Sequence, residues 1–303
     1  MFSVEQADIK ENPRQRRNYV YLEHTQSLCS KCLRVVDAKI IRTDDKKIVL
    51  RKWCAEHGFE SCLLHSDADW YLHAQKYNRP GDIPLKFPTE VERGCPYDCG
   101  VCPDHEQHMC LGLIDLTDDC NLACPTCFAD SKGSAYLTMD QIKAALDGFI
   151  EQEGVGAVIQ FSGGEPTMHP QIVEAVKEAV DRPTEVVMIN TNGIKFAQDE
   201  DLIKRLVDVS ENKLEIYLQF DGFTDEVHQK IRGAKLADIK MKSIENMLKH
   251  GLPINLAAVI QRGVNEDQVG KIVEFGIETK GIRGVNFQPA FFAGRYDHDM
   301  NPM

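Results

Sequence analysis

Short apolar runs alternate with amphipathic patterns over the second half of the chain, from residue 111 onward. The runs predict strands at 112–117, 157–162, 185–190, 215–220, 254–261 and 284–289. Between them, apolar residues recur at helical spacing, beginning with a segment at 142–149 that follows a Thr138 to Gln141 capping box. Similar helical patterns lie at 172–179, 202–207, 244–248 and 269–273. Strands that alternate with helices are typical of parallel β/α units, so the pattern predicts an α/β fold.

The first hundred residues follow a different pattern. Two strand-like segments at 35–41 and 48–53 are joined by the polar turn 44–47 and predict a hairpin, and residues 67–77 predict a short helix. Residues 1–20 are polar and charged and predict a flexible arm. A two-stranded hairpin cannot bury enough apolar surface to be stable alone, so we expect a bound metal ion to tie its ends together.

The eleven cysteines all lie within the first 127 residues and fall into sets of four, four and three. In an intracellular chain this density predicts metal ligands rather than disulfides. The first set frames the hairpin: Cys29, Cys32 and Cys54 are three ligands, and either His57 or Cys62 is the fourth. A histidine ligand favours zinc, whereas a fourth thiolate suits zinc or a mononuclear, rubredoxin-like iron.

The second and third sets share the spacing CxxxCxxC and are separated by what surrounds them. The second has a fourth cysteine close by, which predicts a closed auxiliary [4Fe–4S] cluster with ligands Cys95, Cys99, Cys102 and Cys110; a second zinc site is the alternative. The third set follows the strand predicted at 112–117 and has no fourth cysteine. It can therefore hold three irons of a cubane and leave the fourth open, with ligands Cys120, Cys124 and Cys127.

Glycines and polar residues follow the next predicted strands, at the strand ends where parallel β/α barrels collect their ligands. The second strand leads into Gly163-Gly164-Glu165-Pro166, where the missing side chains let a ligand approach and a carboxylate can pair with an ammonium group. The third and fourth strands lead into the candidate ligand contacts Asn192, Gln219 and Asp221. For each of these three, capping a turn is the alternative role.

The cysteine loop after a first strand and the Gly-Gly-Glu-Pro turn after a second together resemble the radical S-adenosylmethionine (radical SAM) superfamily. The resemblance covers about residues 110–290 and implies a partial (β/α)6 barrel. It implies that S-adenosylmethionine chelates the open iron and that the turn receives its amino group. It further implies that an electron, from a donor such as ferredoxin or flavodoxin, cleaves S-adenosylmethionine to a 5′-deoxyadenosyl radical, which abstracts hydrogen from an unactivated carbon.

The N-terminal cysteine pattern resembles the archaeal tetraether lipid synthases and the related 7,8-dihydro-6-hydroxymethylpterin dimethyltransferases. This implies radical coupling of lipid chains, with methyl transfer to a dihydropterin as the alternative, and hence a lipid or small-molecule substrate. The expected domain order is a flexible arm (1–20), a metal-binding hairpin module (21–65), a linker with the auxiliary iron–sulfur segment (66–110) and the barrel (111–303). Superfamily members commonly carry C-terminal additions, so we expect a chain that is truncated after the last strand.

Charge and hydropathy narrow the choice of partner and location. The formal charge is −12, from 35 basic and 47 acidic residues, whereas nucleic-acid binding requires clustered Lys and Arg. This disfavours an RNA-modifying enzyme that would read RNA through its N-terminal module. No apolar run approaches the roughly 20 residues of a membrane span, and the start lacks the apolar core of a secretory signal, so we expect a cytoplasmic protein. A non-catalytic iron–sulfur electron carrier is the alternative from another functional class.

Overall fold

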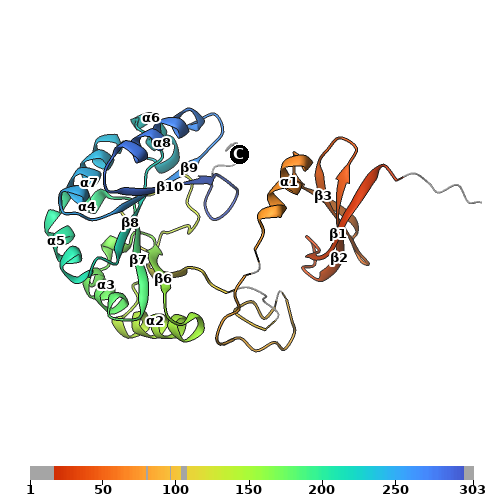
Figure 1. Cartoon of the computed structure of the whole chain (residues 1–303), viewed down its shortest axis with the longest axis horizontal. Coiled ribbons are helices and arrows are strands. Elements are labelled where there is room, and N and C mark those ends of the chain that lie inside the picture. The colour runs from red at the N-terminus through yellow and green to blue at the C-terminus, as the bar shows by residue number, and fades with distance from the viewer. Residues whose placement is uncertain (1–16, 80, 96, 104–107, 297–303) are drawn as a thin grey trace, which may run out of the picture. The chain divides into compact units, whose positions relative to one another are not determined.

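A computed structural model describes residues 17–79, 81–95, 97–103 and 108–296. The chain forms two compact units, each described here by itself (Figure 1). The first consists of Met1–Asp82 and Phe87–Glu106, and the second of Ile83–Lys86 and Gln107–Met303. The first unit contains the first cysteine set and the second unit contains the third, so the two can be analysed independently.

The first unit is built on a four-stranded antiparallel sheet in the order β1-β2-β3-β4. Its strands are β1 (Tyr19–Leu28), β2 (Val35–Thr43), β3 (Ile48–Cys54) and β4 (Gly58–His65). Helix α1 (Ala68–Ala74) and the 3₁₀ turn η1 (Gln75–Tyr77) follow. A small apolar cluster of Ile40, Ile48 and Ala68 joins sheet and helix.

The predicted hairpin is therefore the central pair of a larger sheet, and the two outer strands were not predicted. Most side chains of β1 and β4 are exposed or half-exposed, so these strands lack the apolar alternation that identifies a strand in sequence. Strand β1 begins at Tyr19, inside the segment expected to be a flexible arm; residues 1–16 lie outside the described residues.

The second unit contains a six-stranded sheet in which every neighbouring pair is parallel and the strands follow chain order. The strands are β5 (Gly112–Thr117), β6 (Ala157–Gly163), β7 (Thr184–Thr191), β8 (Leu214–Gln219), β9 (Ile254–Ile260) and β10 (Ile282–Pro289). Strands β5 and β10 form the two edges, so the sheet is an open, partial barrel. The predicted α/β fold class is confirmed, and each strand lies within two residues of its predicted bounds.

Helices cover the outer side of this curved sheet (Figure 1). Five agree with the helical patterns in the sequence: α2 (Met139–Glu153), α3 (Ile172–Val180), α5 (Glu200–Val209), α7 (Ala237–Lys249) and α8 (Val269–Glu278). Two short helices, α4 (Ile194–Gln198) and α6 (Asp225–Arg232), were not predicted, because neither is long enough to show a repeating apolar stripe. The remaining short elements are the 3₁₀ turns η2 (Pro166–Met168) and η3 (Glu266–Gln268).

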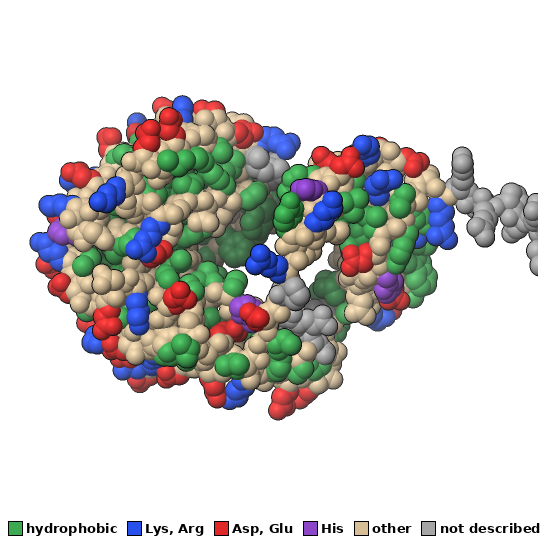
Figure 2. Space-filling model, viewed as in Figure 1, with side chains coloured by type: hydrophobic (Ala, Val, Ile, Leu, Met, Phe, Trp, Pro, Cys, Tyr) green, Lys and Arg blue, Asp and Glu red, His purple; other side chains and the backbone are tan. Residues whose placement is uncertain are grey.

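The apolar core of the second unit lies between sheet and helices. On β5, Ile114 and Leu116 are buried in it, whereas Leu113 and Asp115 point to the opposite face and are exposed. Charged side chains of both signs are scattered over the outer, helical surface (Figure 2). Within the described parts of the chain, no helix is long and apolar enough to cross a membrane. The inner face and the carboxyl ends of the strands are thus the places left for a binding site.

Candidate functional site

The three cysteines after β5 lie on one loop that a distant part of the chain holds in place. Cys124 is buried, and Cys120 and Cys127 are partly buried. The backbones of Cys127 and Arg295, a residue beyond β10, exchange hydrogen bonds with N···O distances of 2.7 and 2.9 Å. The Nε of Arg295 also donates to the Cys124 carbonyl oxygen at 2.8 Å. The segment after the last strand therefore fixes the cysteine loop.

The glycine turn after β6 packs directly on the start of this loop. The Gly164 N–H donates to the Thr117 carbonyl at 2.7 Å, and the Glu165 N–H donates to the Asp119 carbonyl at 2.8 Å. A Cβ at Gly163 would lie 2.3 Å from the Thr117 oxygen, and one at Gly164 would lie 2.0 Å from the Asp119 oxygen. Gly163 also has a φ of +112°. Side chains do not fit here, so both glycines are required to bring the turn against the loop.

The Glu165 carboxylate is fully buried and fully engaged inside the protein. Its Oε1 accepts from the backbone N–H of Thr167 at 3.2 Å and from the hydroxyls of Thr167 and Thr191 at 2.6 and 2.7 Å, and its Oε2 accepts from the Asn192 N–H at 2.8 Å. Three of these four hydrogen bonds fall on Oε1 and one on Oε2, and the pairing of this carboxylate with a ligand ammonium group stays a prediction. Glu165 also ties the glycine turn, which continues into Pro166 and η2, to the end of β7.

Two of the three candidate contacts at the strand ends are also engaged within the protein. The Asn192 amide donates to Asn121 Oδ1 at 2.6 Å, which links the end of β7 to the cysteine loop. Asp221 is fully buried, and its two oxygens accept hydrogen bonds from Arg232 at 2.6 and 2.8 Å. These contacts make Asn192 and Asp221 organising residues, in line with the turn-capping alternative for Asn192, which also accepts from the Ile194 N–H.

Gln219 belongs to a row of polar side chains on the inner face of the sheet. The Gln219 amide lies 3.5 Å from Asn190 Oδ1, and the Asn190 amide donates to Ser162 Oγ at 3.2 Å. Asp115 lies on the edge strand β5, in register with Ser162 on β6, and its side chain is exposed. We call Asp115, Ser162, Asn190 and Gln219 the polar row. It crosses β5 to β8 at their carboxyl ends, directly beside the glycine turn.

Two buried cations next to this site were not predicted from the sequence. Arg232 is 8 % exposed and Lys240 is fully buried. The Lys240 ammonium donates to the Asn192 carbonyl at 2.5 Å, and burial lowers the pKa of Lys240 to about 7. The apolar positions Val227 and Ile231 place Arg232 beside the inward face of α6, but nothing in the sequence identifies its partner.

The cysteine loop offers the donors that a cubane cluster requires. Burial raises the pKa of the Cys120 thiol to about 11, and the Glu165 carboxylate and the thiols of Cys124 and Cys127 contribute to this rise. The three sulfurs are therefore close enough to influence one another's charge. A cluster holds its thiolates farther apart than a single ion does, and cluster formation displaces their protons. The residues present fit a three-cysteine cluster beside a turn that a ligand can approach.

The first unit contains four side chains gathered closely enough to hold a metal ion. The Nδ1 of His57 lies 3.5 Å from the Cys29 sulfur and 3.6 Å from the Cys54 sulfur, and the sulfurs of Cys32 and Cys54 are 3.9 Å apart. Tetrahedral zinc, with Zn–S of about 2.3 Å and Zn–N of about 2.0–2.1 Å, requires about 3.8 Å between sulfurs and about 3.6 Å between sulfur and nitrogen. Among the described residues, this is the only set of His, Cys, Asp and Glu side chains gathered so closely.

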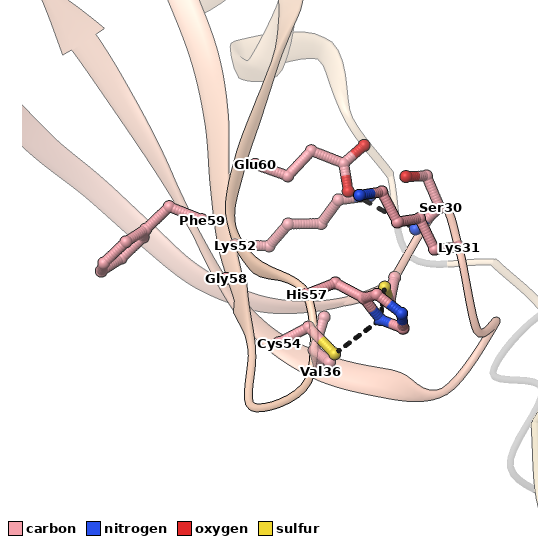
Figure 3. A pocket seen from close by; sticks show the side chains of 10 residues that line it. Ser30, Lys31, Val36, Lys52, Cys54, His57, Gly58, Phe59 and Glu60 are labelled. Atoms are coloured by element: carbon pink, nitrogen blue, oxygen red, sulfur yellow. Dashed lines mark hydrogen bonds and ion pairs between the residues drawn. The ribbon is translucent and has the colours of Figure 1, made fainter.

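The local fold explains why these four residues meet. The Cys29 carbonyl accepts from the Leu33 N–H at 3.0 Å, and backbone N–H groups of Cys32 and Lys31 point at the Cys29 sulfur and lower its pKa to about 6. His57 comes from the turn between β3 and β4 and lines a pocket of about 180 Å³ (Figure 3). Cys62 is exposed on β4, outside this set, so the structure favours His57 over Cys62 as fourth ligand.

The second cysteine set is divided between the two units. Cys95, Cys99 and Cys102 belong to the first unit and Cys110 to the second. The Asp98 carboxylate accepts three backbone N–H groups, from residues 92–94, which orders the loop around the first of these cysteines. Cys102 is buried, while the other three are exposed. An auxiliary cluster on these residues stays a prediction.

Comparison with known proteins identifies the class to which this site belongs. A model of the radical SAM superfamily matches residues 114–276, more than half of the chain. The chain therefore belongs to the radical SAM superfamily, whose members bind a [4Fe–4S] cluster and S-adenosylmethionine. A second family model, described as the HMPTM N-terminal zinc ribbon domain, matches residues 21–66 and so covers the first unit's sheet.

Individual relatives narrow the comparison. A 7,8-dihydro-6-hydroxymethylpterin dimethyltransferase of Methanocaldococcus jannaschii is 38 % identical over 278 residues, which is 90 % of this chain and 54 % of the relative. A GTP 3′,8-cyclase of Synechococcus elongatus is 29 % identical over 184 residues, 58 % of this chain and 54 % of the relative. The crystal structure of Streptococcus suis SuiB bound to S-adenosylmethionine has the same fold, with a TM-score of 0.50, 18 % identity and coverage of 63 % of this chain and 43 % of that one. The chain spans about half the length of the curated relatives it matches.

The glycine contact leads to a first prediction. Because a Cβ at Gly164 would strike a backbone oxygen, Gly164→Ala should lower the free energy of unfolding by about 1–3 kcal/mol and abolish S-adenosylmethionine binding. The matched control is Gly148→Ala in α2, where only the Gln152 amide lies within 4.0 Å and Ala should stabilise by about 0.5–1 kcal/mol. Urea denaturation of the cluster-free protein measures the free energy of unfolding of both variants. Equal stability of the two variants would contradict the backbone contact.

The metal centre of the first unit leads to a second prediction. His57→Ala removes one of four ligands and should leave close to no bound zinc, whereas Cys62→Ser should retain about one zinc ion per chain, whatever iron the barrel cysteines hold. Metal analysis of the two purified variants, with cysteines of the barrel unchanged, gives the comparison. Loss of metal in Cys62→Ser with retention in His57→Ala would show that Cys62 is the fourth ligand after all.

Proposed function

We propose that this chain carries the catalytic barrel of a radical SAM enzyme that methylates a small polar heterocycle of the dihydropterin type. The observation that supports this most directly is the polar row on the inner face of the sheet. A lipid chain lying there would cover the exposed Asp115 carboxylate without offering it a hydrogen-bond donor, at a cost of about 1–3 kcal/mol or more. A pterin ring carries N–H and carbonyl groups along its edges and can supply that donor.

The comparisons support the same choice. The relative from Methanocaldococcus jannaschii that matches 90 % of this chain is a dihydropterin dimethyltransferase. Radical coupling of lipid chains, the first expectation from the sequence, has no comparable support among the relatives described above. Methyl transfer to a dihydropterin, the alternative expectation, is therefore the better supported reaction.

Each part of the site has a defined task in this proposal. Cys120, Cys124 and Cys127 hold the cluster, and the Gly163-Gly164 turn gives S-adenosylmethionine access to backbone groups beside it. When bound, the cluster and S-adenosylmethionine supply the radical chemistry. The protein holds them in position and excludes water. Glu165 keeps the turn in place through its four buried hydrogen bonds, so its effect on the reaction is indirect.

We further propose that Asp115 recognises the substrate. Its carboxylate is exposed on the inner face of an edge strand, one register step from the glycine turn. The adjacent ring N–H and amino group of a pterin present two parallel donors, which match the two oxygens of a carboxylate as the fork of an arginine does. Asp115 would thereby orient the ring against the polar row.

The remaining cofactors and the reductant complete the proposal. Zinc is the metal that best fits the Cys29, Cys32, Cys54 and His57 distances, and four closed ligands give it a structural role. The auxiliary [4Fe–4S] cluster remains a proposal based on the cysteine spacing. A reducing partner such as ferredoxin or flavodoxin would deliver the electron.

Anaerobic reconstitution tests the catalytic part of this proposal. Dithionite, S-adenosylmethionine labelled in its methyl group and a dihydropterin are added to the wild type. One S-adenosylmethionine should be cleaved to methionine and 5′-deoxyadenosine, and a second should donate its labelled methyl group to the pterin and leave as S-adenosylhomocysteine, with dithionite supplying one electron to each step. Cys120→Ala/Cys124→Ala/Cys127→Ala should lose about four irons and form no product, whereas Cys62→Ser should behave as wild type. Iron binding without any cleavage of S-adenosylmethionine, in the full-length protein as well, would instead support an electron carrier.

Asp115 provides a separate prediction on the substrate. Asp115→Asn removes a charged acceptor, so KM for the dihydropterin should rise by about 10-fold to 100-fold while the Kd for S-adenosylmethionine stays unchanged. The matched control is Asp208→Asn, an exposed aspartate on α5 at the outer surface, which should change neither constant. A weakened Kd for S-adenosylmethionine in Asp115→Asn would move this residue from the substrate to the cofactor.

A further inference from the structure

A buried ion pair lies behind the cysteine loop and has no part in the tasks assigned above. Asp221 is fully buried, and Arg232 is 8 % exposed. Nε and one terminal nitrogen of Arg232 donate to the two Asp221 oxygens at 2.6 and 2.8 Å. Burying two charges carries a desolvation penalty even when they are paired, and apolar residues of similar volume are often at least as stable. The stability of the fold alone therefore does not account for this pair.

The pair is rigidly held from the side of the sheet. The Val259 N–H donates to Asp221 Oδ1 at 2.9 Å, and the Asn265 amide donates to the Asp221 carbonyl at 2.8 Å. Asp221 follows β8, while Val259 and Asn265 belong to β9 and the turn after it. The carboxylate is thus fixed by two strand ends, and it fixes the direction in which the guanidinium points.

Arg232 stands at the point where helix α6 meets the cysteine loop. Gly233 ends the helix with a φ of +76°, and a Cβ there would lie 3.2 Å from Pro125 Cδ and 3.5 Å from the Ala123 carbonyl oxygen. The helix end is therefore packed against the residues on either side of Cys124. Arg232 is the last residue of this helix, and its guanidinium is close enough to the Cys124 sulfur for a direct electrostatic interaction.

The other charged groups near this point have weaker effects on the sulfur. The Glu165 carboxylate is occupied by hydrogen bonds from Thr167, Thr191 and Asn192. The Lys240 ammonium bonds the Asn192 carbonyl, and its pKa of about 7 leaves it only partly charged at neutral pH. The Arg232 guanidinium, in contrast, is fully charged at neutral pH. Asp221 and Arg232 together form a buried dipole with its positive end toward Cys124.

We propose that this Asp221–Arg232 dipole is a positioning element that raises the reduction potential of the cluster held by Cys124. The inference rests on the proposed cluster at Cys120, Cys124 and Cys127. Reduction adds one electron, from an external reductant, and no bond is made or broken. The added negative charge is stabilised by a fixed positive charge at a ligand sulfur in a poorly solvated site, because net charge, hydrogen bonds to sulfur and exposure set the potentials of such clusters.

A redox titration followed by electron paramagnetic resonance tests this proposal on the reconstituted full chain. The variant Asp221→Asn/Arg232→Gln replaces the charged pair by a neutral pair of similar shape, so no lone buried charge remains. We expect its equilibrium constant for reduction to fall at least tenfold, a shift of about 59 mV to more negative potential for one electron. Arg232→Lys keeps the positive charge, so its reduction potential should stay within about 59 mV of the wild-type value.

The control is Arg182→Gln. Arg182 follows α3 and forms an ion pair with Asp147 of α2 at 2.7 Å, and its side chain is 16 % exposed against 9 % for Arg232, so the same charge is removed from a partly buried ion pair away from the loop. Its potential should equal that of the wild type. Signals from any auxiliary cluster are removed by repeating each titration with Cys95, Cys99 and Cys102 replaced by Ser.

Several outcomes would overturn the proposal. One is an unchanged potential in Asp221→Asn/Arg232→Gln at full iron content. Another is a tenfold or larger change in the equilibrium constant for reduction in Arg232→Lys, because the geometry of the guanidinium and not its charge would then matter. If the double variant does not hold a cluster, the result for Arg232→Lys decides. Failure of the wild type itself to bind a cluster would instead disprove the proposed function, so the two failures are distinguishable.

Discussion

The backbone contact between the Gly163-Gly164 turn and residues 117–119 is the constraint on which the site depends. It brings the ends of β5 and β6 together without any intervening side chain, at hydrogen-bond distances of 2.7 and 2.8 Å. The cysteine loop begins at this contact and is held at its other end by Arg295. Because the turn contacts the start of the loop, a cluster on the loop and a ligand on the turn would be adjacent. The buried Glu165 carboxylate keeps the turn fixed, because its four donors come from η2 and from the end of β7.

The two faces of the parallel sheet serve different purposes. The helical face is apolar and carries the stability of the second unit, with residues such as Ile159, Phe161 and Leu146 fully buried. The strand ends carry buried groups that cost stability, such as Asp221, and buried cations reach this region from two helices, Arg232 from α6 and Lys240 from α7. Such groups are retained where they position a ligand or set an electrostatic environment. The distribution of buried charge therefore indicates the site independently of the cysteines.

The sequence predicted those parts of the structure that depend on local pattern. The strands of the second unit lie within two residues of their predicted bounds, because a parallel sheet covered by helices requires short apolar runs. The outer strands β1 and β4 were missed because their exposed side chains show no such pattern. Glu165 and Asp221 were predicted as ligand contacts because they follow predicted strands. Their protein partners Thr191 and Arg232 were not predicted, because only the fold brings them near. Arg295 contacts the Cys124 carbonyl from 171 positions away, a separation at which sequence spacing gives no signal.

The two metal-binding regions differ in a way that assigns them different roles. Cys29, Cys32, Cys54 and His57 form a closed set at the spacing of one tetrahedral ion, which leaves no position for a substrate. The sheet they anchor has few buried apolar side chains among the described residues, chiefly Ile40, Ile41 and Ile48 with Ala68 of α1, too few to stabilise it without such an ion. The third cysteine set differs in both respects. It offers three donors, Cys120, Cys124 and Cys127, on a loop that hydrogen bonds within the protein already hold in place. Metal binding is therefore expected to support the fold in the first unit, whereas in the second the fold is complete and the cluster can serve the chemistry.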